Sequence, residues 1–292
     1  MAIKLIIVGL RRSGTTIFWE SLRQDGRLRC YDEPFNPLLQ SLTGEMLEII
    51  KHPEEFQDLL RNDPLDFWER FAPIDPSSEL HERVSDRQRD YLNYLAATGD
   101  DVILDTTRCL FKVEKLKELA PDAVLVHLYR PAAANATSHM LPTSAHSART
   151  KLRRFINTRD FWTRPDRFDY WMFERLVGNS PRSLFAQRLK EIDLDPETVY
   201  ALPAVGKLLA FWRVNYDRAE RDGRQFFGER FISQNFDQFT QDPRGSIQRI
   251  YDAMGLEMPD FDFGRIRPAK APYEADSPKW EEYARLLELP EV

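Results

Sequence analysis

The stretch IKLIIVGLRRSGTT, residues 3–16, joins an apolar segment directly to a glycine-bracketed loop, and it limits the possible folds more than any other feature. The segment is apolar at nearly every position, which is typical of a strand covered on both faces in a parallel sheet. Further short apolar runs, separated by helical patterns, follow at residues 28–31, 101–105, 123–129 and 230–234. We therefore predict an α/β fold, a P-loop-type doubly wound sheet of about five parallel strands.

Two long stretches, near residues 36–100 and 140–200, indicate helical insertions in a single domain of residues 1–292. The second mixes basic with aromatic residues and fits either an acceptor pocket with aromatic walls or the packing of inserted helices. Apolar stripes also predict a helix near residues 205–221 and another that begins after Asp242 and Pro243 and ends at Gly255.

Composition narrows the choice of partners and compartment. A formal net charge of −6 gives no support for nucleic acid as a partner, so we expect any anion site to be local. Cys30 and Cys109 are too few for a disulfide framework and form no metal-ligand spacing. The amino-terminal apolar run is too short to span a membrane. We expect a cytoplasmic protein that requires no metal ion and binds neither nucleic acid nor membrane.

The loop VGLRRSGTT, residues 8–16, has the glycine spacing of a phosphate-binding loop but lacks the lysine of nucleoside-triphosphate enzymes. Its cations are instead Arg11 and Arg12, which precede Gly14. A glycine-rich turn between a strand and a helix directs backbone N–H groups and the helix dipole at an anion. A sulfuryl group carries less negative charge than a terminal phosphate, so amides and one arginine suffice to neutralise it without a metal.

A second anion-binding candidate is HLYRPAAANATSHM, residues 127–140. Arg130 comes just after a strand, Pro131 is placed to begin a helix, and Ser138 follows Arg130 by eight positions, about two turns. Arg130 and Ser138 are therefore candidates to converge on one phosphate. His127 lies within the strand and is interpreted as a hydrogen-bonded core histidine.

Together these motifs resemble those of the sulfotransferases that use 3′-phosphoadenosine 5′-phosphosulfate (PAPS). Arg130 and Ser138 match the 3′-phosphate pair of that family, and FDQFTQDPRGSIQRIYDAMGL resembles its late strand-loop-helix signature. The resemblance implies a PAPS-binding fold, transfer of a sulfuryl group to a hydroxyl or amine, and 3′-phosphoadenosine 5′-phosphate (PAP) as product. The loop resembles the family's 5′-phosphosulfate loop, which implies donor contacts from Arg11, Arg12, Ser13, Gly14, Thr15 and Thr16.

The sequence also departs from the family pattern. Arg12 occupies a position where the cytosolic branch of the family has lysine, and in this it resembles the bacterial and Golgi-type branches. Those branches place an aromatic residue directly after the two threonines to stack on adenine, but this chain has Ile17 there. Trp19 is then a candidate for the adenine contact. Three basic residues lie roughly where relatives bring a basic segment to the 3′-phosphate, with ordinary surface charge as the equal alternative: Arg265, Arg267 and Lys270.

The predicted general base is Glu33, in CYDEPFNP at residues 30–37. Glu33 closely follows the second strand and resembles the acidic base of the bacterial and tyrosyl-protein branches. The catalytic histidine that the cytosolic branch places after its third strand is not found here, where Arg108 lies instead. Asp32 is the second choice, and a solvated turn residue is the alternative interpretation.

We therefore predict a PAPS-dependent sulfotransferase for a small-molecule acceptor, with in-line transfer and with Arg12 and Glu33 as catalytic residues. Two alternatives stay open. One is a P-loop small-molecule kinase that uses ATP and Mg²⁺, with Asp105 as the metal-holding acid. The other is a nucleotide-binding module without catalysis.

Overall fold

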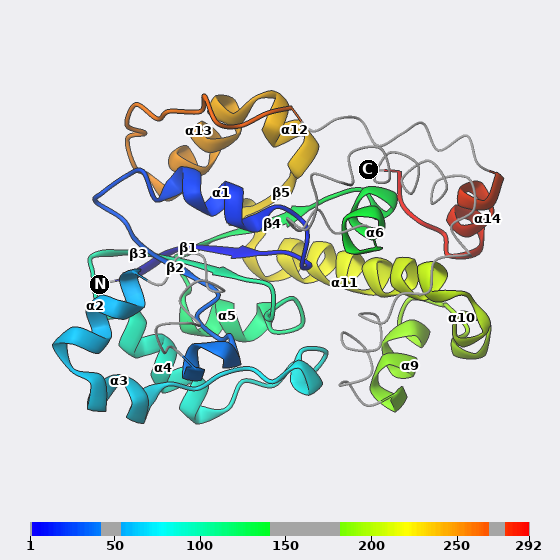
Figure 1. The fold of residues 1–292 in the computed structure, drawn as a ribbon, viewed down its shortest axis with the longest axis horizontal. Coiled ribbons are helices and arrows are strands. Elements are labelled where there is room, and N and C mark those ends of the chain that lie inside the picture. The colour runs from blue at the N-terminus through cyan, green and yellow to red at the C-terminus, as the bar shows by residue number, and fades with distance from the viewer. Residues whose placement is uncertain (1, 42–53, 141–181, 269–277, 292) are drawn as a thin grey trace, which may run out of the picture.

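The computed structural model describes residues 2–41, 54–140, 182–268 and 278–291, and Figure 1 shows its architecture. One sheet contains five parallel strands in the order β2-β3-β1-β4-β5. The strands are β1 Ala2–Val8, β2 Arg29–Asp32, β3 Asp101–Thr106, β4 Val124–Tyr129 and β5 Phe231–Asn235. The apolar runs thus form the predicted strands, and the predicted α/β fold is confirmed.

Helices occupy most of the described connections. The α-helices are α1 Thr15–Leu22, α2 Glu54–Asn62, α3 Pro64–Arg70, α4 Asp86–Ala96, α5 Val113–Leu119, α6 Ala132–Met140, α9 Arg182–Lys190, α10 Pro196–Ala201, α11 Ala204–Phe227, α12 Phe236–Gln241, α13 Pro243–Met254 and α14 Pro278–Leu286. Short 3₁₀ helices are η1 Pro37–Ser41, η3 Pro76–Ser78 and η6 Gly228–Arg230.

Alternate residues of the central strand feed two cores on opposite faces of the sheet. Leu5 and Ile7 belong to the core covered by α1, α12 and α13, while Ile6 and Val8 belong to the core covered by α4, α5 and α11 (Figure 1). All four side chains are fully buried, and burial of each contributes on the order of 1.5–3 kcal/mol. Cover on both faces explains why the strands are apolar at nearly every position.

Local sequence signals set the ends of α13. The Asp242 side chain caps the first turn, Pro243 occupies the first helical position, and Gly255 ends the helix with a φ of 69°. This confirms the helix predicted there. The helix predicted near residues 205–221 is also present, but α11 continues beyond that range to Phe227.

The predicted insertion near residues 36–100 is helical where it is described, through η1, α2, α3, η3 and α4. Most of the stretch near 140–200 lies outside the described residues, and α9 and α10 form its described end. Within the described ranges, no helix is both long enough and apolar enough to cross a membrane.

The register of the strands brings their carboxyl ends to one edge of the sheet. Val8 pairs with Thr106, and Asp32 pairs with Asp105. The loops that follow β1, β2, β3 and β4 therefore open on the same edge, where ligands bind in doubly wound sheets. Strand β1 lies between β3 and β4, so its loop is at the centre of this edge.

Candidate functional site

The loop after β1 contains two close contacts that only glycine allows. A Cβ on Gly9 would lie 2.5 Å from the carbonyl oxygen of Leu128, and one on Gly14 would lie 2.2 Å from the Phe236 ring. Gly14 also has a φ of 92°, which glycine adopts without strain. The chain therefore turns tightly into α1, whose first backbone N–H groups have no side-chain cap. Uncapped N–H groups and the helix dipole form a site for an anion.

Buried polar side chains of α6 hold this loop in place. Asn135 Nδ2 donates to the carbonyl oxygen of Arg11 at 3.2 Å, and His139 Nε2 donates to the same oxygen at 3.0 Å. Burial lowers the pKa of His139 to about 4, so its imidazole is neutral near pH 7. His127, buried beside Glu220 with 2.8 Å between Nδ1 and Oε1, is the core histidine that the sequence predicts.

Arg12, Ser138 and Arg130 lie together at this edge of the sheet. Arg12 Nε donates to the carbonyl and hydroxyl oxygens of Ser138, each at 3.3 Å. Arg12 is exposed and has a φ of 72°, and non-glycine residues in this left-handed region often mark functional sites. Burial lowers the pKa of Arg130, and the neighbouring charge of Arg12 lowers it further. The two sequence motifs thus supply one cluster of cations.

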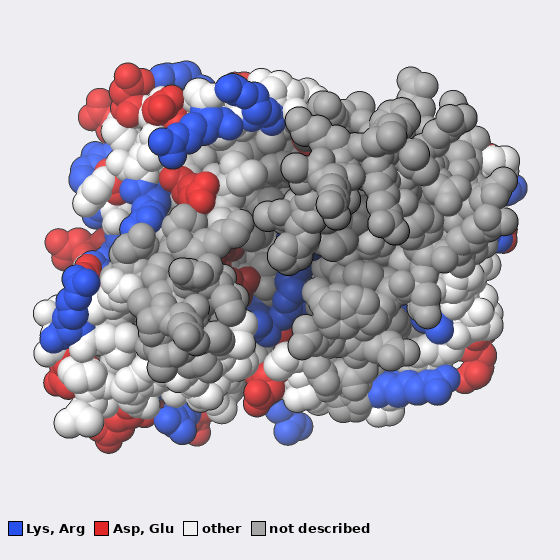
Figure 2. Space-filling view, in the orientation of Figure 1, with Lys and Arg blue, Asp and Glu red and all other residues white. Residues whose placement is uncertain are grey.

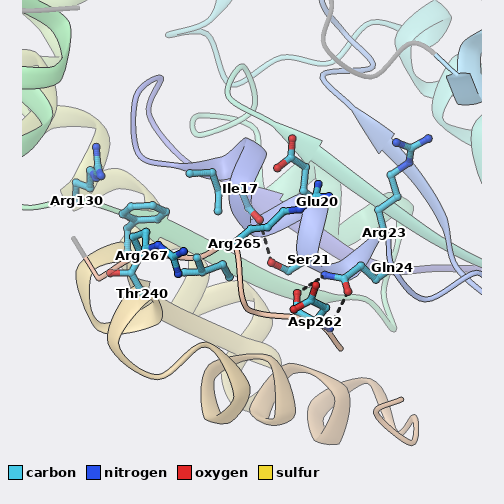
Figure 3. A pocket seen from close by; sticks show the side chains of 12 residues that line it. Ile17, Glu20, Ser21, Arg23, Gln24, Arg130, Thr240, Asp262, Arg265 and Arg267 are labelled. Atoms are coloured by element: carbon cyan, nitrogen blue, oxygen red, sulfur yellow. Dashed lines mark hydrogen bonds between the residues drawn. The ribbon is translucent and has the colours of Figure 1, made fainter. Parts of the chain in front are cut away.

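Arg130 also lines a cavity of about 880 Å³ between α1, α12 and the segment that follows α13 (Figure 3). Its guanidinium carbon lies 4.3 Å from the centre of the Phe236 ring. Its Nε is buried and makes no hydrogen bond to any described residue, although Asp237 Oδ1 lies 3.9 Å away. A buried arginine nitrogen without an acceptor in the protein is available to an oxygen atom of a ligand or of water.

Basic side chains outnumber acidic ones around this cavity. Arg265 and Arg267 reach into it from the segment after α13 (Figure 3). Arg23, which follows α1 and pairs with Glu55 at 2.6 Å, lines it as well. The carboxylates that line it are Glu20 and Asp262. Figure 2 shows a band of basic side chains over α1 and the segment after α13. Arg130, Arg265 and Arg267 therefore give the cavity a positive field that fits an anionic ligand.

The apolar part of the cavity comes from different residues than the sequence suggests. Ile17 lines the cavity and is 44% exposed, and the Phe236 ring lines it as well. Trp19 is fully buried in the core under α1, so the prediction that it contacts adenine is wrong. The reason is helical geometry, because residues two positions apart point to nearly opposite sides of a helix.

Glu33 begins the turn after β2 with a φ of 50°, and its backbone N–H donates to the Asp105 carbonyl oxygen at 2.7 Å. Its Oε1 accepts a hydrogen bond from the Thr107 backbone N–H at 3.1 Å and another from the Thr107 hydroxyl. Its Oε2 is buried without a hydrogen-bond donor among the described residues, and Arg108 Nε lies 3.9 Å from it. One carboxylate oxygen is fixed, and the other keeps its lone pairs free of hydrogen bonds from the described residues.

Two further carboxyl groups lie beside Glu33, on β2 and β3. Burial and the negative charge of Glu33 raise the pKa of Asp32 to about 7. The hydrogen bond from Asp105 has the opposite effect on this pKa but is outweighed. Burial and the charge of Asp32 raise the pKa of Asp105 well above its ordinary value. Asp32 and Asp105 are register partners, so we interpret them as a pair that holds a shared proton near pH 7.

The side chain of Arg11 is directed to Glu79, where both of its Nη atoms form hydrogen bonds. The buried Glu79 carboxylate also accepts a hydrogen bond from Arg108. The sequence prediction missed Glu79 because it lies in the insertion near residues 36–100, where no motif marks single residues. It also missed Phe236, although that residue lies in the late motif.

The remaining predicted residues fall into three groups. Ser13 and Thr15 are buried, whereas Gly14 and Thr16 are partly exposed at the start of α1. Lys270 lies outside the described residues, as do the basic and aromatic side chains of residues 141–181. Of the His, Cys, Asp and Glu side chains that the structure describes, no three are grouped so that they could hold a metal ion.

Residues 5–193 and 177–260 match the family model described as "Sulfotransferase family". No curated protein matches the sequence. Among solved structures, sulfotransferase STF9 from Mycobacterium avium is similar over 100% of this chain and 69% of its own, with 19% identity and a TM-score of 0.45.

Two other solved structures show similar values. The sulfotransferase domain of the olefin synthase from Synechococcus PCC 7002 is 14% identical over 100% of this chain and 90% of its own, with a TM-score of 0.43. A sulfotransferase from Alicyclobacillus acidocaldarius is 15% identical over 99% of this chain and 95% of its own, with a TM-score of 0.42.

Proposed function

Since the chain belongs to the sulfotransferase family, we propose that it transfers a sulfuryl group from PAPS to a hydroxyl or amine of a small molecule. The observation that carries the PAPS part of this proposal is Arg130. Its Nε is buried without a hydrogen-bond acceptor, at the side of a large cavity that three further arginines line. A donor with a phosphosulfate at one end and a 3′-phosphate at the other would satisfy both the loop and this arginine.

The residues that would hold the donor come from two strand-to-helix connections. Arg12 and the amides of Ser13 to Thr16 would bind the 5′-phosphosulfate, because they surround the uncapped start of α1. Arg130 and Ser138 would bind the 3′-phosphate, with Arg265 and Arg267 adding positive charge from the segment after α13. The apolar surfaces of Ile17 and Phe236 in the same cavity fit a purine ring.

PAPS supplies a sulfuryl group attached to a phosphate that leaves readily. The protein then has to position the acceptor, take its proton and stabilise the charge that develops on the departing side. In this proposal Glu33 Oε2 accepts the proton as the acceptor attacks in line with the breaking bond. Arg12 and the loop amides stabilise the negative charge on the bridging and sulfuryl oxygens.

Glu33 is favoured over Asp32 as the base for two reasons. Its Oε2 has no hydrogen-bond donor among the described residues, while Thr107 fixes the orientation of the carboxylate through Oε1. Asp32 instead faces the buried Asp105, and the two carboxyls hold a proton between them near pH 7. The Glu33 side chain is 22% exposed, so an acceptor has to present its reacting group into a recess, which favours a small molecule.

The kinase alternative requires an ionised carboxylate that holds Mg²⁺ beside the loop hydroxyls. Asp105 is the residue in that position, and its burial favours the protonated form, which does not bind cations. The geometry around the loop therefore favours sulfuryl transfer. The non-catalytic alternative predicts donor binding without turnover.

The first test is calorimetric titration of the protein with PAP, beside ATP with Mg²⁺. We expect metal-independent binding of PAP that Arg130→Ala weakens at least about tenfold, because a charged hydrogen bond contributes about 1.5–3 kcal/mol. Arg61→Ala is the matched control, since the Arg61 side chain is 73% exposed and lines no part of this cavity.

A second test measures turnover of labelled PAPS with a panel of phenols, alcohols and amines. Transfer to a member of the panel would establish the reaction. Tighter binding of ATP with Mg²⁺ than of PAP would overturn the proposal in favour of the kinase, and binding of PAP without transfer to any acceptor would favour the non-catalytic module.

A further inference from the structure

The Glu79 carboxylate accepts hydrogen bonds from two arginines that lie in two different loops of the site. Arg11 Nη1 donates to Glu79 Oε2 at 2.7 Å, and Arg11 Nη2 donates to Oε1. Arg108, which comes shortly after β3, donates to the same Oε1 from its Nη1. The side chains of Glu79 and Arg108 are each only 9% exposed, so water screens these charges weakly.

Arg108 lies between Glu79 and Glu33. Its Nε is 3.9 Å from Glu33 Oε2, which is beyond hydrogen-bond distance. Neither of these two atoms has a hydrogen-bond partner among the described residues, although both are buried. The other nitrogens of the guanidinium are engaged, Nη1 by Glu79 and Nη2 by Asn36 Oδ1 at 3.3 Å. A shift of about one ångström would therefore close a direct hydrogen bond between Arg108 and Glu33.

The segment that carries Glu79 is itself firmly held. The buried Lys112 donates from Nζ to the carbonyl oxygens of Ser78 at 2.9 Å and of His81 at 2.6 Å. Arg188 donates from Nε and Nη2 to the carbonyl oxygen of Leu80 at 3.2 and 3.1 Å. These bonds fix the backbone on both sides of Glu79, so its carboxylate is a stationary partner for the two arginines.

We propose that Glu79 is a positioning residue that draws Arg108 away from Glu33 and thereby keeps Glu33 a strong enough base. This inference rests on the proposed role of Glu33. An arginine near a carboxylate lowers the pKa of that carboxylate by about 1–3 units, and this effect grows as the two charges approach each other. A general base with a lower pKa removes a proton less effectively.

The charged groups that face Glu33 come from every side of the recess. Asp32 and Asp105, on β2 and β3, lie beside it as a carboxyl pair whose pKa values are raised, so near pH 7 they do not both carry a negative charge. Arg108 and, at longer range, Arg11 act on it as positive neighbours. Glu79 bonds to both arginines and to neither of the acids, so the loss of its charge would leave their positive charge to act on Glu33.

The test is Glu79→Gln, which removes the charge, keeps one of the two accepting oxygens and replaces the other with an NH2 group. The pKa of Glu33 is followed through its carboxyl ¹³C resonance, assigned by the loss of that signal in Glu33→Gln. The pH dependence of kcat is followed with PAPS and the most active acceptor of the panel. We expect the Glu33 pKa and the acid limb of kcat to move down together by about one unit or more, with an unchanged Kd for PAP.

Two further variants separate positioning from a merely structural role. Glu79→Gln combined with Arg108→Gln should return the acid limb toward its wild-type position, since the released arginine is gone. Glu82→Gln is the matched control, because Glu82 also pairs with two arginines, Arg188 and Arg218, but not with Arg108. A structural defect would lower kcat by the same factor at every pH and leave the limb in place.

If Glu79→Gln does not fold, the Glu33 pKa is measured in Arg108→Gln alone. Because Arg108 Nε lies 3.9 Å from Glu33 Oε2 in a buried setting, its removal should raise the Glu33 pKa by about one unit or more. An unshifted Glu33 resonance in Arg108→Gln, or in folded Glu79→Gln, would overturn the inference. If instead Glu33→Gln retains the wild-type kcat, the proposed function of Glu33 fails.

Discussion

The carboxyl pair Asp32 and Asp105 makes the stability of the protein depend on pH in the direction opposite to that of ordinary ion-paired acids. The pKa of Asp32 is about 7 in the folded protein, against an ordinary value of 3.8. Between these values the folded state holds a proton that the unfolded state has lost, so the free energy of unfolding falls as pH rises through this window. A shift of about three units corresponds to roughly 4 kcal/mol, which is an upper bound.

The perturbation that tests this is Asp32→Asn, which keeps the shape of the side chain and removes its titration. The variant should gain stability relative to the wild type between about pH 4.5 and about pH 8, by on the order of 2–4 kcal/mol, because the coupled partner Asp105 takes part of the shift. The assay is urea unfolding followed by tryptophan fluorescence at several pH values across the window.

The control is Asp260→Asn, whose side chain is 92% exposed and should show no pH-dependent difference from the wild type. A difference between Asp32→Asn and the wild type that stays constant across the window would refute the reasoning. In that case Asp32 would be ionised throughout and would be available as a base beside Glu33.

Three further predictions concern the loop and the donor site. Gly14→Ala should lower the free energy of unfolding, measured in urea, by at least about 2 kcal/mol, because the new Cβ would overlap the Phe236 ring and the backbone at this position is left-handed. Gly26→Ala is the control, and it should have little effect because the space around Gly26 is open. Glu33→Gln should lower kcat at least about 100-fold in the PAPS assay and leave the calorimetric Kd of PAP unchanged, and a weakened Kd would speak against the base role. PAP should bind more weakly as KCl is raised, since several arginines line the cavity, and a Kd independent of salt would contradict an electrostatic site.

The sequence predicts those parts of the fold that depend on local signals. The strands are visible because both faces of the sheet are covered, which requires apolar side chains at successive positions such as Leu5 and Ile6. The ends of α13 are visible because Asp242, Pro243 and Gly255 act within one turn of the helix. The loop after β1 is visible because Gly14 is needed for its backbone geometry.

Features that depend on distant contacts could not be predicted in this way. Arg11 lies in a recognisable loop, but its partner Glu79 is 68 positions away in a stretch without motifs. The burial of Trp19, a candidate for the adenine contact, has the same origin, because which side of α1 faces the core depends on the sheet beneath it. The cavity is formed by segments that only the fold brings together, so no spacing in the chain reveals it.

The strand order β2-β3-β1-β4-β5 also separates two kinds of chemistry at one edge of the sheet. The carboxyl ends of β2 and β3 carry the acids Asp32, Glu33 and Asp105, while the connections after β1 and β4 carry Arg12 and Arg130. In-line sulfuryl transfer needs a proton acceptor on one side of the sulfur and charge stabilisation on the other. In the proposed reaction the topology would supply that arrangement without any side chain having to cross the site, and Glu79 would keep Arg108 from neutralising the acidic side.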